Sequence, residues 1–442
     1  MSGGPERVDA IVVGARCAGS AAAVALARSG RRVVALDRGR FPSDTLSTHL
    51  LWPSTVAELA ALGVLPAVEA LGAPRLPWAL AGGAGVQLRG RFRPVDGIGH
   101  ALCVRRPGMD AALVATARAA GAEVRERARV TGLVRDRDGR VAGVRWRHAG
   151  GDGGERELRA PLVIGADGRR SLVAREVGAE QPYRSSVSGR ACYFGYWEDP
   201  HEGWRDTAAQ WRDGPELGTA FPCDGGLVLA LLQPPVARVA AFRADLEGEY
   251  RATIARIGPM AERLAGARLV GRVRSATGIA SYFRRSAGPG WALAGDAGHF
   301  KDPVTAQGIR DALRYGRELG AAAAPLLDDP AALDPALRAW ERRRERECLE
   351  VYQWTNGLAR GEPLSPLEAE LYRVAAQRPA LVSDMLEVFS RQRRPSRVLS
   401  PPRAAMIAGR ALLRRGARGA ALHAAGRELA GAWADSRERA RA

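Results

Sequence analysis

The 442-residue chain is poor in the residues that form disulfides and metal sites. Its five cysteines are scattered and form no C-x-x-C pair, and its six histidines lack the spacing of metal ligands. The sequence therefore predicts neither a disulfide framework nor a metal centre. These residues are Cys17, Cys103, Cys192, Cys223, Cys348, His49, His100, His148, His201, His299 and His423.

Long apolar segments are also absent. No uncharged apolar stretch reaches the roughly 18 residues that a membrane-spanning helix needs. The first twenty residues contain Glu6, Arg7 and Asp9, which is not typical of a secretory signal peptide. We therefore expect a cytoplasmic protein with reduced thiols.

Lysine is almost missing from a strongly basic chain. Lys301 is the only lysine among 66 basic residues, and with 48 acidic residues the net charge is +18. Abundant arginine, alanine and glycine together indicate a bias in genome composition. One cluster stands out, because residues 391–420 hold nine arginines and no acid. No RNA- or DNA-binding module accompanies this cluster, so we expect no nucleic-acid binding.

What is present is typical of a globular protein, with 46% hydrophobic and 26% charged residues. Residues 8–14 form a short apolar run that predicts a buried strand, residues 19–29 predict a helix, and residues 32–36 predict a second strand. This order is the first half of a dinucleotide-binding unit. Apolar runs at 161–165 and 291–294 predict two more strands. Between about 188 and 233, alternating segments broken by glycine and aspartate predict antiparallel hairpins.

The turn after the first strand reads Gly14-Ala15-Arg16-Cys17-Ala18-Gly19-Ser20. A strand-to-helix turn of this kind points backbone N–H groups and the helix dipole at a pyrophosphate. Arg16 occupies the place of the middle glycine of G-x-G-x-x-G, which is a departure from the motif. Asp37 lies 23 residues after Gly14, where an acid is expected to bind ribose hydroxyls.

Two further motifs follow strands. One reads Gly165-Ala166-Asp167-Gly168-Arg169-Arg170-Ser171, and the other reads Gly295-Asp296-Ala297-Gly298-His299, followed by residues 302–309 with the sequence DPVTAQGI. An isolated Asp-Gly pair is usually a hairpin turn. The order and spacing of the three motifs are what is specific.

With Arg106-x-x-Met109-Asp110, these motifs resemble those of the FAD-dependent oxidoreductases with the para-hydroxybenzoate hydroxylase fold. That superfamily includes aromatic hydroxylases, geranylgeranyl reductases and flavin-dependent halogenases, and the resemblance covers about residues 8–345. It implies an α/β fold with a Rossmann-like FAD-binding domain (about 1–75, 100–185 and 270–345). An antiparallel-sheet substrate domain (about 76–99 and 186–269) is interleaved with it, and a helical C-terminal region (346–442) follows.

The resemblance also implies roles for individual residues. The ADP half of FAD is held by the first motif and Asp37, Arg106 lies near the pyrophosphate or ribityl chain, and Asp296 binds the ribityl hydroxyls. Asp167 is linked to both FAD and nicotinamide-nucleotide binding, and residues 303–309 pass beside the flavin ring, where we expect a helix that starts near Thr305. The implied cofactor contacts are Gly14, Ala15, Arg16, Ala18, Gly19, Asp37, Arg38, Arg106, Val130, Asp167, Gly295, Asp296, Pro303, Gln307, Gly308 and Ile309.

Halogenases of this superfamily carry a W-x-W-x-I-P motif and a lysine on an early loop, and this chain has neither. The leading interpretation is a monooxygenase that uses NAD(P)H and O₂, through a flavin C4a-hydroperoxide, to hydroxylate or epoxidise a bulky apolar molecule of secondary metabolism. The alternative is a geranylgeranyl-reductase-like enzyme that saturates isoprenoid double bonds. A third interpretation is a binding protein without turnover.

We expect the substrate to contact aromatic residues of the antiparallel segment: Tyr193, Tyr196, Trp197, Trp211 and Phe221. His49 lies in the segment that passes the flavin in this superfamily. Its imidazole could act as a base or proton relay, or it could be a hydrogen-bonded loop residue.

The C-terminal region places Met406, Ile407, Leu412 and Leu413 among arginines. We expect these helices to pack on the substrate domain or to mediate self-association. Peripheral contact with an anionic membrane is the alternative, and the sequence leaves the oligomeric state open.

Overall fold

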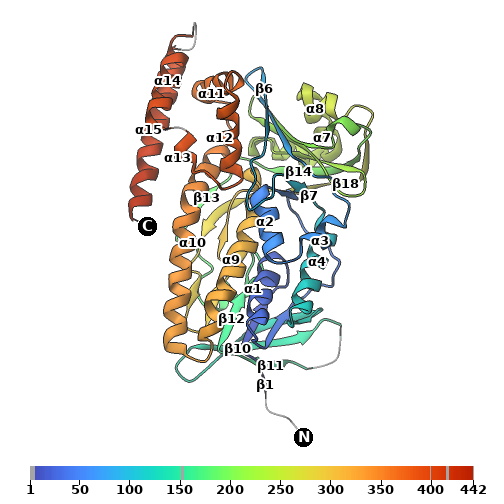
Figure 1. The fold of residues 1–442 in the computed structure, drawn as a ribbon, viewed down its shortest axis with the longest axis vertical. Coiled ribbons are helices and arrows are strands. Elements are labelled where there is room, and N and C mark those ends of the chain that lie inside the picture. The colour runs from blue at the N-terminus through green and yellow to red at the C-terminus, as the bar shows by residue number, and fades with distance from the viewer. Residues whose placement is uncertain (1–4, 151–153, 399, 415–417, 442) are drawn as a thin grey trace.

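The computed structural model describes residues 5–150, 154–398, 400–414 and 418–441. A six-stranded sheet forms the centre of the lower half of the molecule (Figure 1). Its strands pair in parallel except at β20, and its apolar runs are buried on both faces, as expected of a parallel sheet. The order is β20 (Ala287–Gly288), β21 (Trp291–Leu293), β12 (Leu162–Gly165), β2 (Ala10–Val13), β3 (Val33–Leu36) and β8 (Glu123–Arg125).

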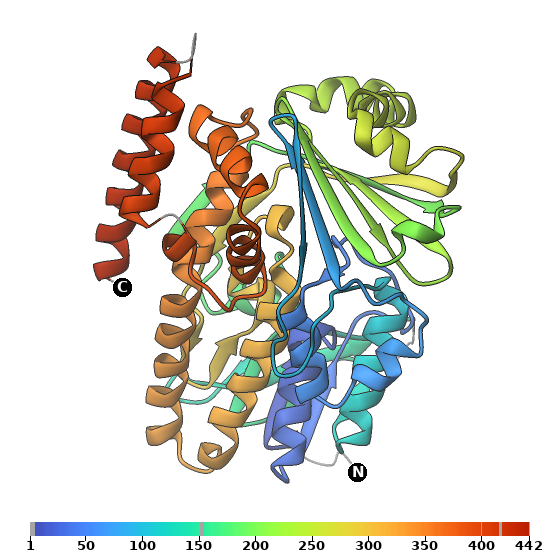
Figure 2. The same cartoon turned by 45° about the horizontal axis from the view of Figure 1, so that its top comes forward.

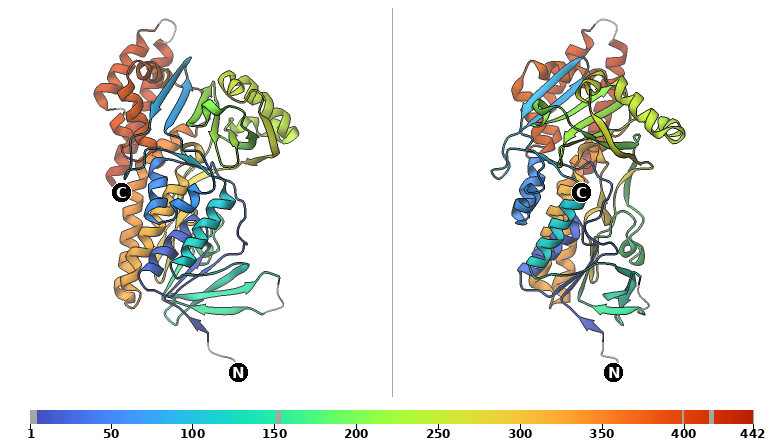
Figure 3. Two further views of the ribbon diagram at one scale, coloured as in Figure 1. Left: turned by 45° about the vertical axis from the view of Figure 1, so that its right-hand side comes forward. Right: turned by 90° about the vertical axis from the view of Figure 1, so that its right-hand side faces the viewer.

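Different elements pack on the two faces of this sheet. On one face, Val12 and Ile164 pack against α1 (Cys17–Arg28), α4 (Arg106–Ala119) and α9 (Gly308–Ala323). On the other, Ile11 and Val163 pack against a four-stranded sheet at the end of the molecule near the N-terminus (Figure 3). That sheet has the order β1 (Glu6–Arg7), β11 (Arg156–Arg159), β10 (Val141–His148) and β9 (Ala128–Arg135).

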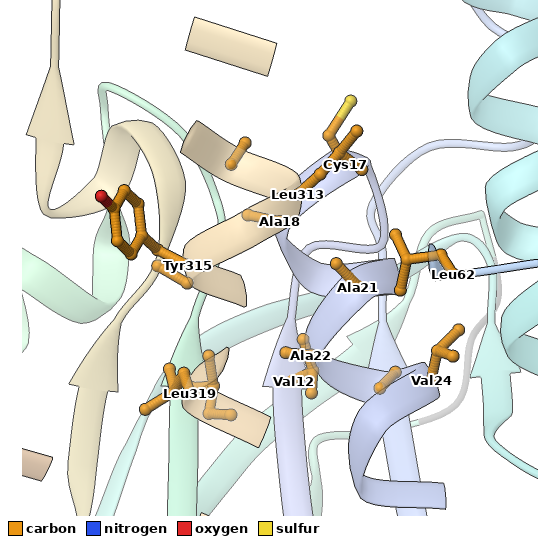
Figure 4. Close-up of a cluster of buried hydrophobic side chains, with 14 of the residues drawn as sticks. Val12, Cys17, Ala18, Ala21, Ala22, Val24, Leu62, Leu313, Tyr315 and Leu319 are labelled. Carbon is orange, nitrogen blue, oxygen red and sulfur yellow. The ribbon is translucent and has the colours of Figure 1, made fainter. Parts of the chain in front are cut away.

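Helices α1 and α9 lie in close contact (Figure 4). A Cβ atom at Gly316 of α9 would lie 2.5 Å from the Ala18 carbonyl oxygen of α1, and one at Gly320 would lie 2.6 Å from that of Ala22. The alanines of α1 and the glycines of α9 therefore let the two backbones touch. This contact fixes the second half of α9 against the first half of α1.

A seven-stranded sheet forms the upper part of the molecule, and α6 (Val239–Ala244), α7 (Leu246–Arg256) and α8 (Gly258–Arg263) cover one of its faces (Figure 1). Neighbouring strands are antiparallel except for the parallel β15–β5 pair. The order is β18 (Arg268–Ala276), β14 (Cys192–Glu198), β17 (Leu227–Leu232), β16 (Glu216–Pro222), β15 (Thr207–Asp213), β5 (Trp78–Gly83) and β6 (Val86–Arg91).

Short strands and helices join the two large sheets. A three-stranded sheet and a two-stranded ribbon lie at the junction, and Ser171 caps α5 by accepting the Ala174 N–H. These elements are β13 (Arg184–Val187), β19 (Ala280–Phe283), β22 (His299–Phe300), β4 (Leu50–Leu51), β7 (Leu102–Cys103), α2 (Pro53–Ala61), α3 (Leu65–Glu69) and α5 (Leu172–Glu176).

The C-terminal region is helical over its described residues and packs beside the β5–β6 hairpin (Figure 2). A Cβ atom at Gly90 of β6 would lie 2.8 Å from the Val382 side chain, so hairpin and helices are in direct contact. Among the described helices, none is long and apolar enough to span a membrane. The helices are α10 (Pro330–Leu358), α11 (Pro366–Ala376), α12 (Pro379–Phe389), α13 (Pro395–Val398), α14 (Pro401–Leu412) and α15 (Arg418–Arg441).

Several arginines of the 391–420 cluster pair with acids from other segments. Arg393 and Arg403 lie against Asp384, and Arg410 and Arg414 hold the buried carboxylate of Glu370. The charge of this segment therefore ties the C-terminal helices together. Among the described residues of this region, the large apolar side chains of Leu413, Leu422, Leu429 and Trp433 are exposed.

The predicted fold class is confirmed, because the structure has a Rossmann-like sheet, a separate antiparallel sheet and a helical C-terminal region. One predicted boundary is wrong. The helix expected from Thr305 begins at Gly308, because Ala306 has a left-handed backbone conformation with φ of 52°, which a helix does not accommodate. The Thr305 hydroxyl instead bonds to that of Thr355 at 2.9 Å.

Candidate cofactor and substrate site

The first motif forms a tight turn between β2 and α1. Gly14 has φ of +98°, and a Cβ atom there would lie 2.5 Å from the Ala166 carbonyl oxygen. A Cβ at Gly19 would lie 1.8 Å from the Gly14 carbonyl oxygen, so both positions require glycine. No side chain caps α1, which leaves the N–H groups and positive dipole end of its first turn for an anionic ligand.

Arg16, at the place of the middle glycine, is tied to its surroundings. Its guanidinium pairs with Asp110 of α4 and donates to the Ser43 hydroxyl at 2.9 Å and the Ser43 carbonyl at 3.3 Å. It also lies 5.4 Å from the Phe41 ring centroid. The side chain thus fastens segment 41–44 to the start of α1.

Asp110 is fully buried and joins α4 to α1. It holds both Arg16 and Arg106, whose guanidinium bonds to it at 2.9–3.0 Å and contacts the Cys17 sulfur at 3.4 Å. Burial raises the pKa of the Cys17 thiol to about 12, so this cysteine is a packed thiol and not a nucleophile. Two arginines on one carboxylate leave excess positive charge beside the turn.

Asp37 follows β3 and braces the same turn. Its carboxylate accepts the Ala15 N–H at 2.8 Å and the Gly39 N–H at 2.7 Å. Arg38 is exposed beside it. The Asp37 carbonyl accepts the Ala128 N–H at 2.8 Å, which brings β9, and with it the buried Val130, to this edge of the sheet.

The other two motifs place their aspartates differently. Asp167 accepts the Leu172 and Val173 N–H groups at the start of α5, at 2.7 and 3.3 Å. Asp296 lies in a helical turn at Gly295–Ala297. Burial raises its pKa, and the charges of Arg169, Arg106 and Lys301 oppose that shift. These cations balance the Asp296 carboxylate, and no hydrogen bond from the described residues reaches its oxygens, which leaves them available to a ligand.

Residues 302–309 form a turn followed by an uncapped helix. The Asp302 side chain accepts the Val304 N–H at 2.9 Å, and Pro303–Thr305 make one 3₁₀ turn. Helix α9 then starts at Gly308 without a side-chain cap. The buried Gln307 amide donates to the Phe389 carbonyl at 2.9 Å, and Ile309 packs on the core beneath.

These geometric features match known proteins. Residues 7–192 match the family described as FAD binding domain. The menaquinone reductase of Mycolicibacterium smegmatis is 30% identical over 352 residues, or 74% of this chain and 78% of that protein. The chain belongs to this family of FAD-binding proteins. It is a FAD-dependent oxidoreductase.

Other known proteins are also similar to this chain. A digeranylgeranylglycerophospholipid reductase of Methanosarcina mazei is 29% identical over 235 residues, or 51% of this chain and 53% of that protein. The solved structure of a flavin-dependent brominase has a TM-score of 0.71 at 17% identity, covering 91% of this chain and 98% of the other. A probable FAD-dependent monooxygenase from Pseudomonas aeruginosa has a TM-score of 0.67 at 20% identity, covering 86% and 100%. The two structures show the fold alone.

The residues of the oxidoreductase fit FAD. Two uncapped helix starts, α1 and α9, suit the pyrophosphate and the electron-rich edge of a flavin. Gly14 and Gly19 let the backbone approach closely, and Asp296 has acceptor oxygens to offer ribityl hydroxyls. The Arg16 side chain does not obstruct the cofactor turn, because its guanidinium is held by Asp110 and Ser43.

The seven-stranded sheet divides the predicted substrate residues between two faces. The far face carries Tyr193, Trp197 and Trp211, which are buried against α6, α7 and α8. The near face carries Tyr196 and Phe221. These three residues lie away from the cofactor loops, because side chains alternate along a strand and helices cover that face. Their contact with the substrate stays a prediction.

The near face meets the cofactor loop directly. Phe194 and Phe221 belong to one buried cluster with Ala306 of the 302–309 loop and with Trp52, whose indole N–H donates to the Thr305 carbonyl at 2.9 Å. Phe194 is not among the substrate-contact residues predicted from the sequence. Alternation along the strand places Phe194 on the other face from Tyr193 and Gly195, but the sequence does not show which of the two faces is covered by helices.

His49 lies on the near face and is fully buried. Its Nε2 atom is 2.9 Å from the Tyr196 hydroxyl, and its ring packs edge-on to Phe194 and Tyr196. Burial, reinforced by the charge of Arg106, lowers the pKa of His49 to about 4. The imidazole is therefore neutral at pH 7.

Lys301 forms a second buried cluster beneath the cofactor loops. Its ammonium pairs with Asp311 and donates to His299 Nε2 at 3.0 Å, while His299 Nδ1 donates to the Tyr282 carbonyl. Burial opposes ionisation of Asp311, but Lys301, Arg391 and Arg310 outweigh it and hold its pKa well below the usual range. His299, Asp311 and Cys348 lie close enough together to hold a metal ion, but the ammonium already bonds to two of them.

Proposed function

We propose that this oxidoreductase reduces a carbon–carbon double bond in an isoprenoid-type substrate. The observation that carries the proposal is the 30% identity to a menaquinone reductase over 74% of the chain. Its likeness to a digeranylgeranylglycerophospholipid reductase agrees with it, because both relatives are named for lipid substrates. The apolar near face of the seven-stranded sheet suits such a molecule.

FAD, when bound and reduced by NAD(P)H as the proposed reductant, would supply a hydride to one carbon of the double bond, and a proton that comes ultimately from solvent would add to the other. The protein's own residues hold and orient the two partners. Arg16, Arg106 and the start of α1 would hold the pyrophosphate, and Asp296 would hold the ribityl chain. Phe194 and Phe221, which pack with the 302–309 loop, would exclude water from the reacting carbons.

Monooxygenation is the second candidate, in which NAD(P)H and O₂ serve to hydroxylate or epoxidise an apolar molecule. It is favoured by the same apolar near face, because oxygen transfer from a flavin needs a dry site. Halogenation is not proposed. The lysine it needs should face the substrate, whereas Lys301 is buried in an ion pair with Asp311.

A mass measurement separates the two candidates. The FAD-loaded protein would be incubated with NADH or NADPH and a prenylated naphthoquinone, once without oxygen and once in air. A product that is formed without oxygen and that, after any quinol has been reoxidised to quinone, still carries two extra hydrogens in its prenyl chain is the expected result. A product heavier by one oxygen, formed only in air, would replace the reductase proposal with the monooxygenase one. Oxidation of the nicotinamide with neither product would contradict both.

A further inference from the structure

The near face of the seven-stranded sheet is largely apolar, and the Thr219 hydroxyl on it is bonded to the Leu231 carbonyl at 3.4 Å. His49 and Tyr196 form a polar pair on this face. His49 and Tyr196 of strand β14 meet there although they lie 147 residues apart in the sequence. The charged side chains around the pair are matched already, because Arg274 pairs with Asp44 and Arg105 pairs with Asp224 at 2.6 Å. A ligand on this face would therefore meet the pair as its main polar contact.

His49 is held in an unusual backbone conformation. Its φ of 60° lies in the left-handed region, which few residues other than glycine occupy, and such residues gather at functional sites. Its backbone is fixed on both sides, since the His49 N–H donates to the Ser47 hydroxyl and its carbonyl accepts the Val104 N–H. The imidazole is thus placed by a rigid loop.

The unused nitrogen of His49 decides which way the hydrogen bond runs. Nδ1 is buried and makes no hydrogen bond of normal length and angle to a described residue. A neutral imidazole carries one proton, and a buried N–H without an acceptor is rarer and costlier than a bare acceptor. The tautomer with the proton on Nε2 is therefore favoured. In that tautomer the His49 Nε2–H donates to the Tyr196 oxygen, and the phenol hydrogen of Tyr196 remains free.

His49 is fully buried and Tyr196 is half-buried, so Tyr196 is the member of the pair that a ligand can contact. Burial raises the pKa of Tyr196 above its usual value, so the phenol keeps its hydrogen at neutral pH. A neutral donor without an unpaired cation nearby suits a neutral acceptor better than a carboxylate or phosphate.

We propose that Tyr196 is the hydrogen-bond donor of the substrate site and that it binds the carbonyl oxygen of a quinone-type head group, while His49 is the positioning residue that orients it. This inference rests on the proposed function and names the substrate class more closely. It also changes the role predicted for His49, which acts through Tyr196 and not on the substrate itself.

Binding to the oxidised, FAD-loaded protein tests this without any turnover. The probes are 2-methyl-1,4-naphthoquinone and 2-methylnaphthalene, which share a ring shape but differ in their carbonyl groups. Each would be titrated while the absorbance spectrum of the bound flavin is followed. For Tyr196→Phe we expect the dissociation constant of the quinone to rise about tenfold and that of the hydrocarbon to stay unchanged.

Tyr193→Phe is the matched control. Tyr193 lies on the same strand but on the far face, and its buried hydroxyl has no partner among the described residues, so both probes should bind as to the wild type. His49→Asn should weaken quinone binding by less than Tyr196→Phe, because asparagine tolerates the left-handed backbone but does not hold the phenol in the same way.

Two results would overturn the proposal. One is a Tyr196→Phe protein that binds the quinone as tightly as the wild type. The other is a variant that loses both probes equally, which would make Tyr196 a packing residue. If the prenyl-reduction assay gives no product but Tyr196→Phe still weakens binding of the quinone and not of the hydrocarbon, the proposed function is rejected. The donor role of Tyr196 is then retained.

Discussion

Lys301, the only lysine of the chain, is ion-paired with Asp311 in the protein interior. Arg310 binds the same carboxylate at 3.0 Å, and Arg391 lies 3.9 Å away. One carboxylate therefore joins the 295–302 loop, the first turn of α9 and the segment after α12. The pair sits directly under the loops that would hold the flavin, which makes it a structural support of the cofactor site.

Removal of the lysine charge should destabilise the protein. Lys301→Met leaves Asp311 buried with fewer cations, and we expect the free energy of unfolding to fall by about 3 kcal/mol. Urea unfolding at pH 7 would measure this. Arg75→Met is the control, because the Arg75–Glu69 pair is exposed and should contribute less than about 1 kcal/mol. Equal losses in both variants would contradict the structural role of Lys301.

Asp296→Ala should abolish stoichiometric FAD binding. The variant removes the carboxylate whose oxygens are balanced only by nearby positive charge. The ratio of flavin to protein absorbance in the purified protein measures the effect, and Asp213→Ala, on a β-turn far from the motifs, is the control. Retention of full flavin by Asp296→Ala would reject the assignment of this residue.

Gly14→Ala and Gly30→Ala form a matched pair. Both glycines have positive φ, but a Cβ atom meets a carbonyl oxygen at 2.5 Å at Gly14 and nothing within 4 Å at Gly30. Gly30→Ala should therefore cost only the backbone strain, roughly 1–2 kcal/mol, and keep FAD. Gly14→Ala should lose FAD as well. If the two variants bind flavin alike, then the close contact with Ala166 does not matter for the cofactor turn.

Acidification should destabilise the protein through His49. Its pKa is about 4 in the folded protein and about 6.5 when unfolded, so only the unfolded chain takes up this proton between those values. The stabilisation is complete above pH 6.5 and is lost as the pH falls towards 4. Between pH 7 and 5 the wild type should lose about 2 kcal/mol more than His49→Asn. Parallel losses in urea unfolding would show that His49 titrates normally.

Short-range signals in the sequence were enough to predict the cofactor half of the molecule. The apolar runs at 8–14, 32–36, 161–165 and 291–294 predicted the strands at β2, β3, β12 and β21, because a strand buried on both faces needs a continuous apolar run. The glycines of the first turn were equally clear, since only a residue without a Cβ fits there.

The substrate half depended on contacts between distant segments. Strand β14 is apolar on both faces, so its pattern could not show that Tyr193 and Trp197 face α6–α8 while Tyr196 faces His49. The structural role of the arginine cluster was also not evident from the sequence, because its acidic partners Asp384 and Glu370 lie outside it.

By itself, the sequence determined the fold class and the cofactor turns, because strand periodicity and glycine stereochemistry act within a few residues. Only the tertiary structure decided which face of the seven-stranded sheet is covered by helices α6–α8 and which nitrogen of His49 lacks a hydrogen bond to the described residues. Those properties depend on which helices cover a sheet and on atoms 147 residues apart, and no local pattern encodes them.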